Sequence, residues 1–359
     1  MSHPPRPKKL DLPTEKLGKL HTLSLHKLQS GSVSEQALLL QACMEDGFFY
    51  LDFTQSRLWS TLANDIESVF ELAEKLFGYP SDVKGLFDVD KVSDLKMNGY
   101  KPKGRNIVSK TGKSDGFESW ALPRNGLFQL SKDPFPCPPA IATYTPSIRS
   151  LLQGLGTAAH VVLSSLSTSL SLPAGQRFED FQSPSRPSPD ILRLLKYHAD
   201  QDARCLPQTP HTDLGSLTFV FSTMPGLQVL PPDGHDSAAE PSPWRYVEPR
   251  RGHAVVNVDD CLAVMTNGLL RNALHRVGPV DGRPMPERYS LAYLMRPEDD
   301  TVLRVLDSPR IPRPEKTTGQ GHDDVTSREW IRRKFSALRG QRNGADLDRV
   351  LAGGRGVLA

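Results

Sequence analysis

The chain has 359 residues, a net charge of +3, 38% hydrophobic and 24% charged residues, all ordinary for a globular protein with a sizeable core. Its basic residues are scattered, so the composition favours no nucleic-acid partner. There is no signal peptide and no apolar run of about 18 residues, so we expect no membrane association. The four cysteines are far apart and form no CxxC pair, which is typical of reduced thiols in a cytoplasmic protein.

The first half of the chain is predicted to be rich in helices. Residues 1–18 contain several prolines and are expected to be a flexible tail, and residues 19–173 form the helix-rich region. The elements predicted here, in chain order, are a strand over 19–28, a helix over 32–46 that begins with a capping box, a strand over 48–53, a helix over 57–77, a loop or hairpin over 98–116 and a helix over 146–170.

The second half is predicted to be mainly β-structure. Residues 174–190 are rich in Pro, Ser and charge and indicate a surface connection. The apolar runs that follow predict a β-sandwich or barrel, with strands over 191–197, 216–222, 226–230, 245–248, 253–258, 261–266 and 289–295. We assign 174–310 to this core, 311–340 to a C-terminal helical region and 341–359 to a disordered tail, all within one integrated domain.

Two histidines and an aspartate have the spacing of a metal site. His211 and Asp213 are two residues apart, so in an extended chain both side chains point to the same face, and His275 follows after several predicted strands. Two imidazoles and one carboxylate on one face of an octahedron are typical of non-haem iron(II) oxygenases. An HxD tripeptide alone also occurs outside metal sites, and a lone histidine is often a core or surface residue.

Arg288 and Ser290 indicate a carboxylate site close to these candidate ligands. They begin a predicted strand and share one face of it. A planar guanidinium beside a hydroxyl can bind a carboxylate through two charge-assisted hydrogen bonds and a neutral one. A structural arginine on a barrel strand is the alternative, and it would need a buried anion of its own.

Several motifs in the expected order resemble the isopenicillin-N-synthase-like branch of the 2-oxoglutarate and iron(II) dioxygenases. The motifs are DGFF at 46–49, HTDLGSLT at 211–218, GLQV at 226–229, WRYV at 244–247, NG at 267–268, HRV at 275–277 and RYS at 288–290. The resemblance implies an α+β fold with a distorted double-stranded β-helix, or jelly roll, wrapped by helices. It further implies that His211, Asp213 and His275 bind Fe(II), and that Arg288 and Ser290 bind the distal carboxylate of 2-oxoglutarate, with O2 as the oxidant.

The resemblance also indicates residues around the co-substrate and the substrate. Tyr197 corresponds to a co-substrate tyrosine in an NxYP segment, although Leu195 and His198 stand where the family has Asn and Pro; an ordinary strand tyrosine is the alternative. The candidate substrate contacts are Asn98, Tyr100, Lys103, Arg105, Arg193, Leu195, Val220, Leu227, Val277 and Leu294. Structural alternatives are a salt bridge for Arg193, a solvated basic loop for the lysine at 103, and plain core for the apolar residues.

The expected function is oxidation of a small-molecule metabolite, by hydroxylation, desaturation or ring rearrangement, with release of succinate and CO2. The sequence resembles fungal members of secondary metabolism. Two alternatives stay open: an Fe(II) oxidase of the isopenicillin N synthase type, which needs no keto acid, and a non-catalytic small-molecule binder. Neither the substrate nor the oligomeric state follows from the sequence.

Overall fold

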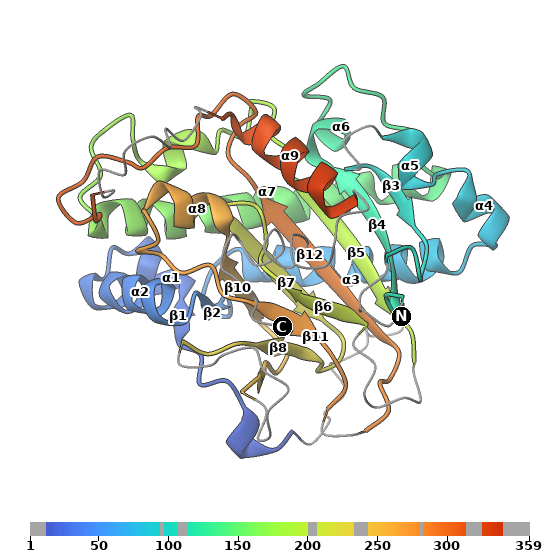
Figure 1. Ribbon diagram of the computed structural model, residues 1–359, viewed down its shortest axis with the longest axis horizontal. Helices are drawn as coiled ribbons and strands as arrows, with labels where there is room; N and C mark the ends of the chain where they lie inside the picture. Colours follow the sequence, from blue (N-terminus) through green and yellow to red (C-terminus); the bar gives the residue numbers. More distant parts are fainter. Residues whose placement is uncertain are drawn as a thin grey trace.

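The computed structural model describes residues 12–93, 97–106, 114–199, 207–232, 243–280, 283–313 and 325–339, and within these ranges the strands form two sheets. The larger sheet has the order β1 (Thr22–Ser24), β2 (Phe48–Asp52), β10 (His253–Val258), β7 (Leu217–Ser222), β12 (Arg288–Met295), β5 (Ile191–Tyr197), β4 (Phe117–Pro123) and β3 (Gly99–Lys101). The smaller sheet has the order β6 (Gln208–His211), β11 (His275–Val277), β8 (Leu227–Val229) and β9 (Arg245–Tyr246). Every strand pair is antiparallel except β1 with β2 (Figure 1).

The central strands of the larger sheet are buried on both faces, because alternate residues point to opposite sides. On β7, Phe219 packs into the main hydrophobic core, whereas Val220 packs with residues of the smaller sheet. On β5, Leu194 belongs to the main core, whereas Leu195 and Tyr197 pack with Val277 of β11. One face therefore lies against helices and the other encloses the space between the two sheets.

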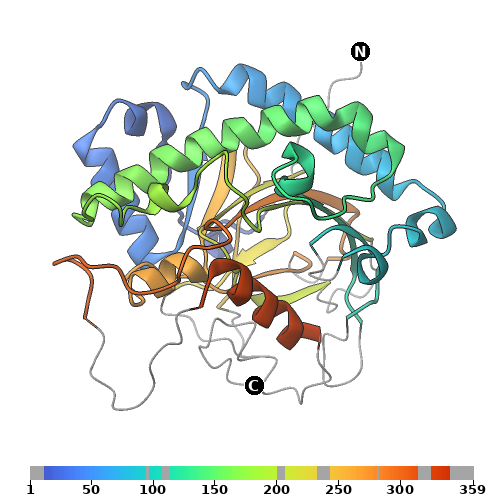
Figure 2. The same ribbon diagram turned by 90° about the horizontal axis from the view of Figure 1, so that it is seen from above.

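Two long helices cover the helix-facing side of the larger sheet. They are α3 (Trp59–Phe77) and α7 (Pro139–Ser169), which run across the molecule side by side in Figure 2 and contribute many apolar residues to the main core. The shorter elements are η1 (Thr14–Lys16), α1 (Leu25–Gln29), α2 (Val33–Glu45), α4 (Ser81–Gly85), α5 (Val89–Val92), α6 (Arg124–Phe128), η2 (Phe178–Phe181), α8 (Asp260–Met265) and α9 (Ser327–Arg339). Within the described ranges, no helix is both long and apolar enough to cross a bilayer.

Most predicted elements are present, with boundaries shifted by a few residues. The helix predicted over 32–46 is α2, whose first turn is capped by the Ser32 hydroxyl, which accepts a hydrogen bond from the Glu35 amide. The strands predicted over 48–53, 191–197, 253–258 and 289–295 correspond to β2, β5, β10 and β12. The expectation of a β-sandwich or barrel wrapped by helices is confirmed. Strands from residues 19–173 and from 174–310 share the larger sheet.

Three predictions about elements were wrong. The strand predicted over 19–28 is only β1, because the chain turns into α1 with Ser24 as its N-cap. The strand predicted over 261–266 is α8, since a short apolar run fits a buried helix as well as a strand. The helix predicted over 146–170 begins at Pro139 and contains Pro146. Residues 12–18 belong to the tail predicted over 1–18, and the amide of Gly18 donates a backbone hydrogen bond to the Tyr246 carbonyl. The tail predicted over 341–359 lies outside the described residues.

Candidate active site

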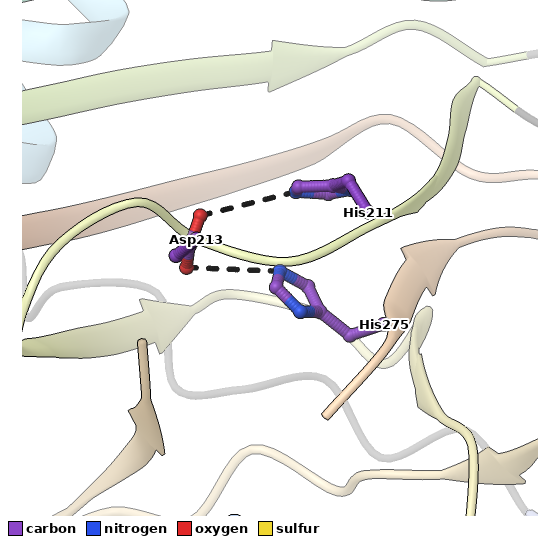
Figure 3. A group of neighbouring side chains, drawn as sticks. All are labelled: His211, Asp213 and His275. Carbon is purple, nitrogen blue, oxygen red and sulfur yellow. Dashed lines mark ion pairs between the residues drawn. The ribbon is translucent and has the colours of Figure 1, made fainter. Parts of the chain in front are cut away.

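The two candidate histidine ligands lie on paired strands. His211 ends β6, His275 begins β11, and the two residues are direct partners in the antiparallel register. Asp213 lies in the turn after β6 (Figure 3), with its Oδ1 4.0 Å from Nε2 of His211 and its Oδ2 3.7 Å from Nε2 of His275. One ligand atom from each residue lies within 4.8 Å of the others. The structure thus brings together residues that are up to 64 positions apart in the sequence.

A close approach of two backbone segments fixes the turn that carries Asp213. A Cβ at Gly215 would overlap the carbonyl oxygen of Met295, so a residue without a side chain is required there. The next amide, of Ser216, donates a 2.7 Å hydrogen bond to the same carbonyl. The glycine of the HTDLGSLT motif therefore ties the metal-site turn to the end of β12.

Both imidazoles have their Nε2 atoms facing the carboxylate. Nδ1 of His211 lies 2.9 Å from the Thr209 carbonyl and Nδ1 of His275 lies 3.4 Å from the Ala273 carbonyl, which favours the tautomer with the proton on Nδ1. Burial, followed by the neighbouring His275, lowers the pKa of His211 to about 4. His211 is therefore neutral near pH 7, as a metal ligand must be.

The candidate carboxylate ligand is kept ionised by its surroundings. Burial raises the pKa of Asp213, but the two histidines and a hydrogen bond from Asn257 outweigh this effect and lower it overall. Nδ2 of Asn257 donates to Oδ2 of Asp213 at 3.0 Å and to Oδ1 of Asp259 at 2.8 Å. Burial and the charge of Asp213 raise the pKa of Asp259 well above its ordinary value.

These residues fit an Fe(II) ion. The donor set is two neutral imidazole nitrogens and one carboxylate, each oriented by a partner on its other side, which is the usual arrangement of a metal ligand and its supporting shell. Three protein ligands on one side of an ion leave positions for a co-substrate and O2.

A guanidinium clamp lies on the same cavity. Arg288 is 1% exposed; its Nε donates to the Met224 carbonyl at 2.9 Å and its Nη2 to the Ser222 hydroxyl at 2.6 Å. The Ser222 hydroxyl is 3.0 Å from that of Ser290, and the Tyr197 ring lies 4.9 Å from the guanidinium carbon. Nη1 of Arg288 is buried and has no hydrogen-bond partner among the described residues. A buried donor without a protein partner fits the binding of a carboxylate ligand.

One cavity of about 140 Å³ joins the metal site to the clamp. Its wall contains the three candidate ligands, the three candidate co-substrate residues, and six of the predicted substrate contacts, namely Arg193, Leu195, Val220, Leu227, Val277 and Leu294. A larger cavity of about 180 Å³ under α3 shares Val220, Leu227 and Arg288 with it, but its described wall includes none of the candidate metal ligands. The chemistry therefore belongs to the smaller cavity.

The other four predicted substrate contacts are placed elsewhere, outside the described wall of this cavity. The amide of Asn98 donates to the Pro136 carbonyl at 3.2 Å, and the hydroxyl of Tyr100 donates to Glu118 at 2.6 Å. Arg105 forms ion pairs with two aspartates of the α5 region, and Lys103 is exposed. The polar residues of this segment therefore lie at the surface or contact a buried ion pair, and not the described wall of the cavity.

Sequence reasoning missed several residues of the site: Gln208, Thr218, Ser222, Asn257, Arg296 and Phe335. The alternation of β7 could have indicated Thr218 and Ser222, because both share a face with Val220. Asn257 is 44 residues from Asp213 in the sequence, and no spacing pattern predicts that contact. Phe335 reaches the cavity from α9, which is the red helix at the front of Figure 2.

Known proteins with similar sequences support the 2-oxoglutarate-dependent alternative. Residues 189–297 match the 2OG-Fe(II) oxygenase superfamily. The chain is 32% identical over 336 residues to the 2-oxoglutarate-dependent dioxygenase gloE of Glarea lozoyensis, covering 93% of this chain and 92% of that protein. It is 29% identical to the 2-oxoglutarate-dependent dioxygenase frbH of Dothideomycetidae sp., covering 93% and 95%.

Solved structures share the fold. A full-length Neurospora crassa protein in complex with alpha-KG has a TM-score of 0.71 at 21% identity, covering 91% of this chain and 98% of that one. The dioxygenase for auxin oxidation in rice has a TM-score of 0.62 at 23% identity, covering 93% and 100%. With the jelly-roll core, the His–Asp–His cluster and these relatives together, the chain belongs to the non-haem 2-oxoglutarate-dependent dioxygenases, which use Fe(II), 2-oxoglutarate and O2.

Proposed function

We propose that this dioxygenase oxidises a small-molecule metabolite, by hydroxylation in the first instance, and releases succinate and CO2. Desaturation or ring rearrangement would need only a different fate for the same substrate radical. The sequence resembles fungal members of the family that act in secondary metabolism, and the proteins similar to this chain come from several fungi. The proposal therefore assigns the reaction to fungal secondary metabolism.

One observation carries the proposal: the His–Asp–His cluster and the unpartnered nitrogen of Arg288 open on the same cavity. In this proposal His211, Asp213 and His275 hold the ion. A dicarboxylic keto acid has one end for the ion and a second carboxylate for the guanidinium. A monocarboxylic keto acid would leave Nη1 of Arg288 buried and unpaired, so the cavity selects 2-oxoglutarate over shorter keto acids.

O2 is the oxidant, and the Fe(II) ion and the keto acid would activate it when bound, the keto acid being oxidised to succinate and CO2. The protein contributes positioning. Asn257 holds the aspartate ligand, and Ser222 with the Met224 carbonyl holds the guanidinium. Ser290 and Tyr197 complete the carboxylate site. The apolar wall keeps bulk water away from the reacting atoms; it consists of Leu195, Val220, Leu227, Val277 and Leu294.

The test needs no knowledge of the substrate at first. Purified protein is titrated with Mn(II), a redox-inactive substitute for Fe(II), and then with 2-oxoglutarate or pyruvate in a calorimeter. We expect binding of 2-oxoglutarate only after the metal, and at least about 100-fold weaker binding of pyruvate. With Fe(II) and O2, succinate should form slowly, and faster when the true substrate is added from a panel of fungal metabolites.

The R288A variant provides the contrast in these assays. It should bind the metal as the wild type does and lose affinity for 2-oxoglutarate, because the distal carboxylate is left without its cation. Substrate conversion without succinate release would instead favour an oxidase of the isopenicillin N synthase type. A wild-type protein that binds neither metal nor keto acid would contradict the proposal.

A further inference from the structure

Arg193 is an arginine in the cavity wall that neither the candidate metal site nor the clamp uses. It lies in the middle of β5, directly opposite Ala292 of β12 and Ala121 of β4. Its side chain lines the cavity together with His211 and Asp213. Its Nε is buried without a hydrogen-bond partner, and no described carboxylate lies within ion-pair distance of it.

Other buried arginines of this protein are occupied by structural contacts. Arg124 donates to the hydroxyl of Ser188 and to backbone carbonyls of the 183–186 segment. Arg296 donates from Nη1 to the Pro189 carbonyl, although its Nε, like that of Arg193, is buried without a hydrogen-bond partner among the described residues. A structural role for Arg193 would require a comparable set of acceptors. Among the described residues it has none, which distinguishes it from these two.

The charges around Arg193 also call for an anion. Among the described residues of the cavity wall there are three arginines, Arg193, Arg288 and Arg296, and one carboxylate, Asp213, which would be a ligand of the ion. Arg193 has no carboxylate of its own among these residues, and the apolar side chains beside it do not compensate its charge. An uncompensated buried charge is costly, so a further anion stabilises the loaded site.

We propose that Arg193 binds a carboxylate of the organic substrate, so that the natural substrates of this enzyme are acids with an apolar body. The inference rests on the proposed function and narrows it to a substrate class. A guanidinium binds a carboxylate through two parallel hydrogen bonds, which orients the substrate as well as attracting it. The apolar part of the acid would lie against Leu195, Val220 and Leu294, which line the same cavity. A substrate held there would also lie close to the ion, because Asp213 is part of the same cavity wall.

The near-metal carboxylate of 2-oxoglutarate is a second anion that could reach Arg193. The two sources are separated by measuring both ligands on the same variants. R193Q removes the charge, and R193K keeps the charge but loses the planar fork. K196Q is the matched control, because Lys196 is on the same strand, faces out of the cavity and pairs with Glu287 at 3.1 Å. Melting transitions establish that each variant is folded.

The probes are two matched pairs of acid and amide, cinnamate with cinnamamide and hexanoate with hexanamide. Each is titrated into protein loaded with Mn(II) and 2-oxoglutarate, and binding is followed by ligand-detected NMR. The wild type and K196Q should bind the acid of at least one pair about ten-fold or more tightly than its amide. R193Q should bind acid and amide alike, and R193K should keep part of the preference. All should bind 2-oxoglutarate within about two-fold of the wild type.

Two results would overturn the assignment while leaving the proposed function intact. One is a wild type that prefers neither acid over its amide, whatever the variants do. The other is an R193Q variant whose affinity for 2-oxoglutarate falls as far as that of R288A, which would make Arg193 a co-substrate residue. Failure of the wild type to bind Mn(II) and 2-oxoglutarate at all would overturn the proposed function together with this inference.

Discussion

The hydroxyl of Ser222 offers a sharp test of how the carboxylate clamp works. Two contacts restrain the guanidinium of Arg288, the Ser222 hydroxyl at 2.6 Å and the Met224 carbonyl at 2.9 Å. Fixing a long side chain such as arginine costs about 1.5–2 kcal/mol of rotamer freedom. S222A removes one restraint of two, so about half of that cost is transferred to the binding step. We expect a loss of about 1 kcal/mol, or about five-fold in the Kd for 2-oxoglutarate.

The assay is calorimetric titration of 2-oxoglutarate into the Mn(II)-loaded protein, with the affinity for Mn(II) measured separately. T223A is the control, since Thr223 accepts a 3.1 Å hydrogen bond from the Tyr289 amide next to the clamp but does not contact Arg288. S222A should fall between T223A, which binds as the wild type does, and R288A, which loses the cation itself. A wild-type Kd for S222A would refute the reasoning, and so would an equal loss of metal affinity.

Three further changes test the metal site, a buried ion pair and the helix packing. D213A should lose Mn(II) binding in the same titration, because two imidazoles remain without the charge that balances the ion. Burial raises the pKa of Glu118, but hydrogen bonds from Lys84 and Tyr100 outweigh burial and lower the pKa overall. Ionised Glu118 therefore stabilises the folded state fully above its ordinary pKa of 4.5, and this stabilisation is lost as the pH falls through the lowered pKa of the folded state. E118Q should therefore cost about 3 kcal/mol of unfolding free energy at pH 7 and less at pH 4 in urea titrations. In α7, G156A should raise the unfolding free energy by about 0.5–1 kcal/mol, whereas G154A should lower it, because a Cβ there would lie 2.7 Å from a leucine of α3; equal effects would contradict this packing.

The framework of the site was predictable because it depends on periodic patterns. Strand alternation and turn residues located β5, β7, β10 and β12, and the HxD spacing placed two candidate ligands on one face. The third candidate ligand, His275, was inferred from its position after several predicted strands and from the resemblance, since nothing local distinguishes it from other histidines. The structure adds the reason why it reaches the site: it is the register partner of His211.

The polar surroundings of the site were not predictable, because they depend on contacts between distant segments. Asn257 contacts Asp213 only because β10 and β7 pair in one register, and a shift of one residue would turn its amide away from Asp213. The 98–105 segment shows that contacts between distant segments also determine where polar residues of a loop lie. Its residues were expected at the substrate, but Tyr100 and Lys84 satisfy a buried Glu118 instead. A polar residue that the sequence places near a site can instead pair with a buried charge elsewhere, because buried charges require hydrogen-bond partners.

Arg193 has fewer possible protein partners in the structure than its sequence context indicated. From the sequence a structural salt bridge was an equal alternative, because strand position alone does not say whether an acid lies opposite. The structure places alanines opposite Arg193 on both neighbouring strands, so neither pairing partner can supply a carboxylate. Glu118, the acid nearest to it on β4, already accepts from Lys84 and Tyr100. A buried cation whose protein partners are otherwise engaged or apolar is stabilised by a ligand, and its position beside Asp213 makes the substrate the ligand that fits.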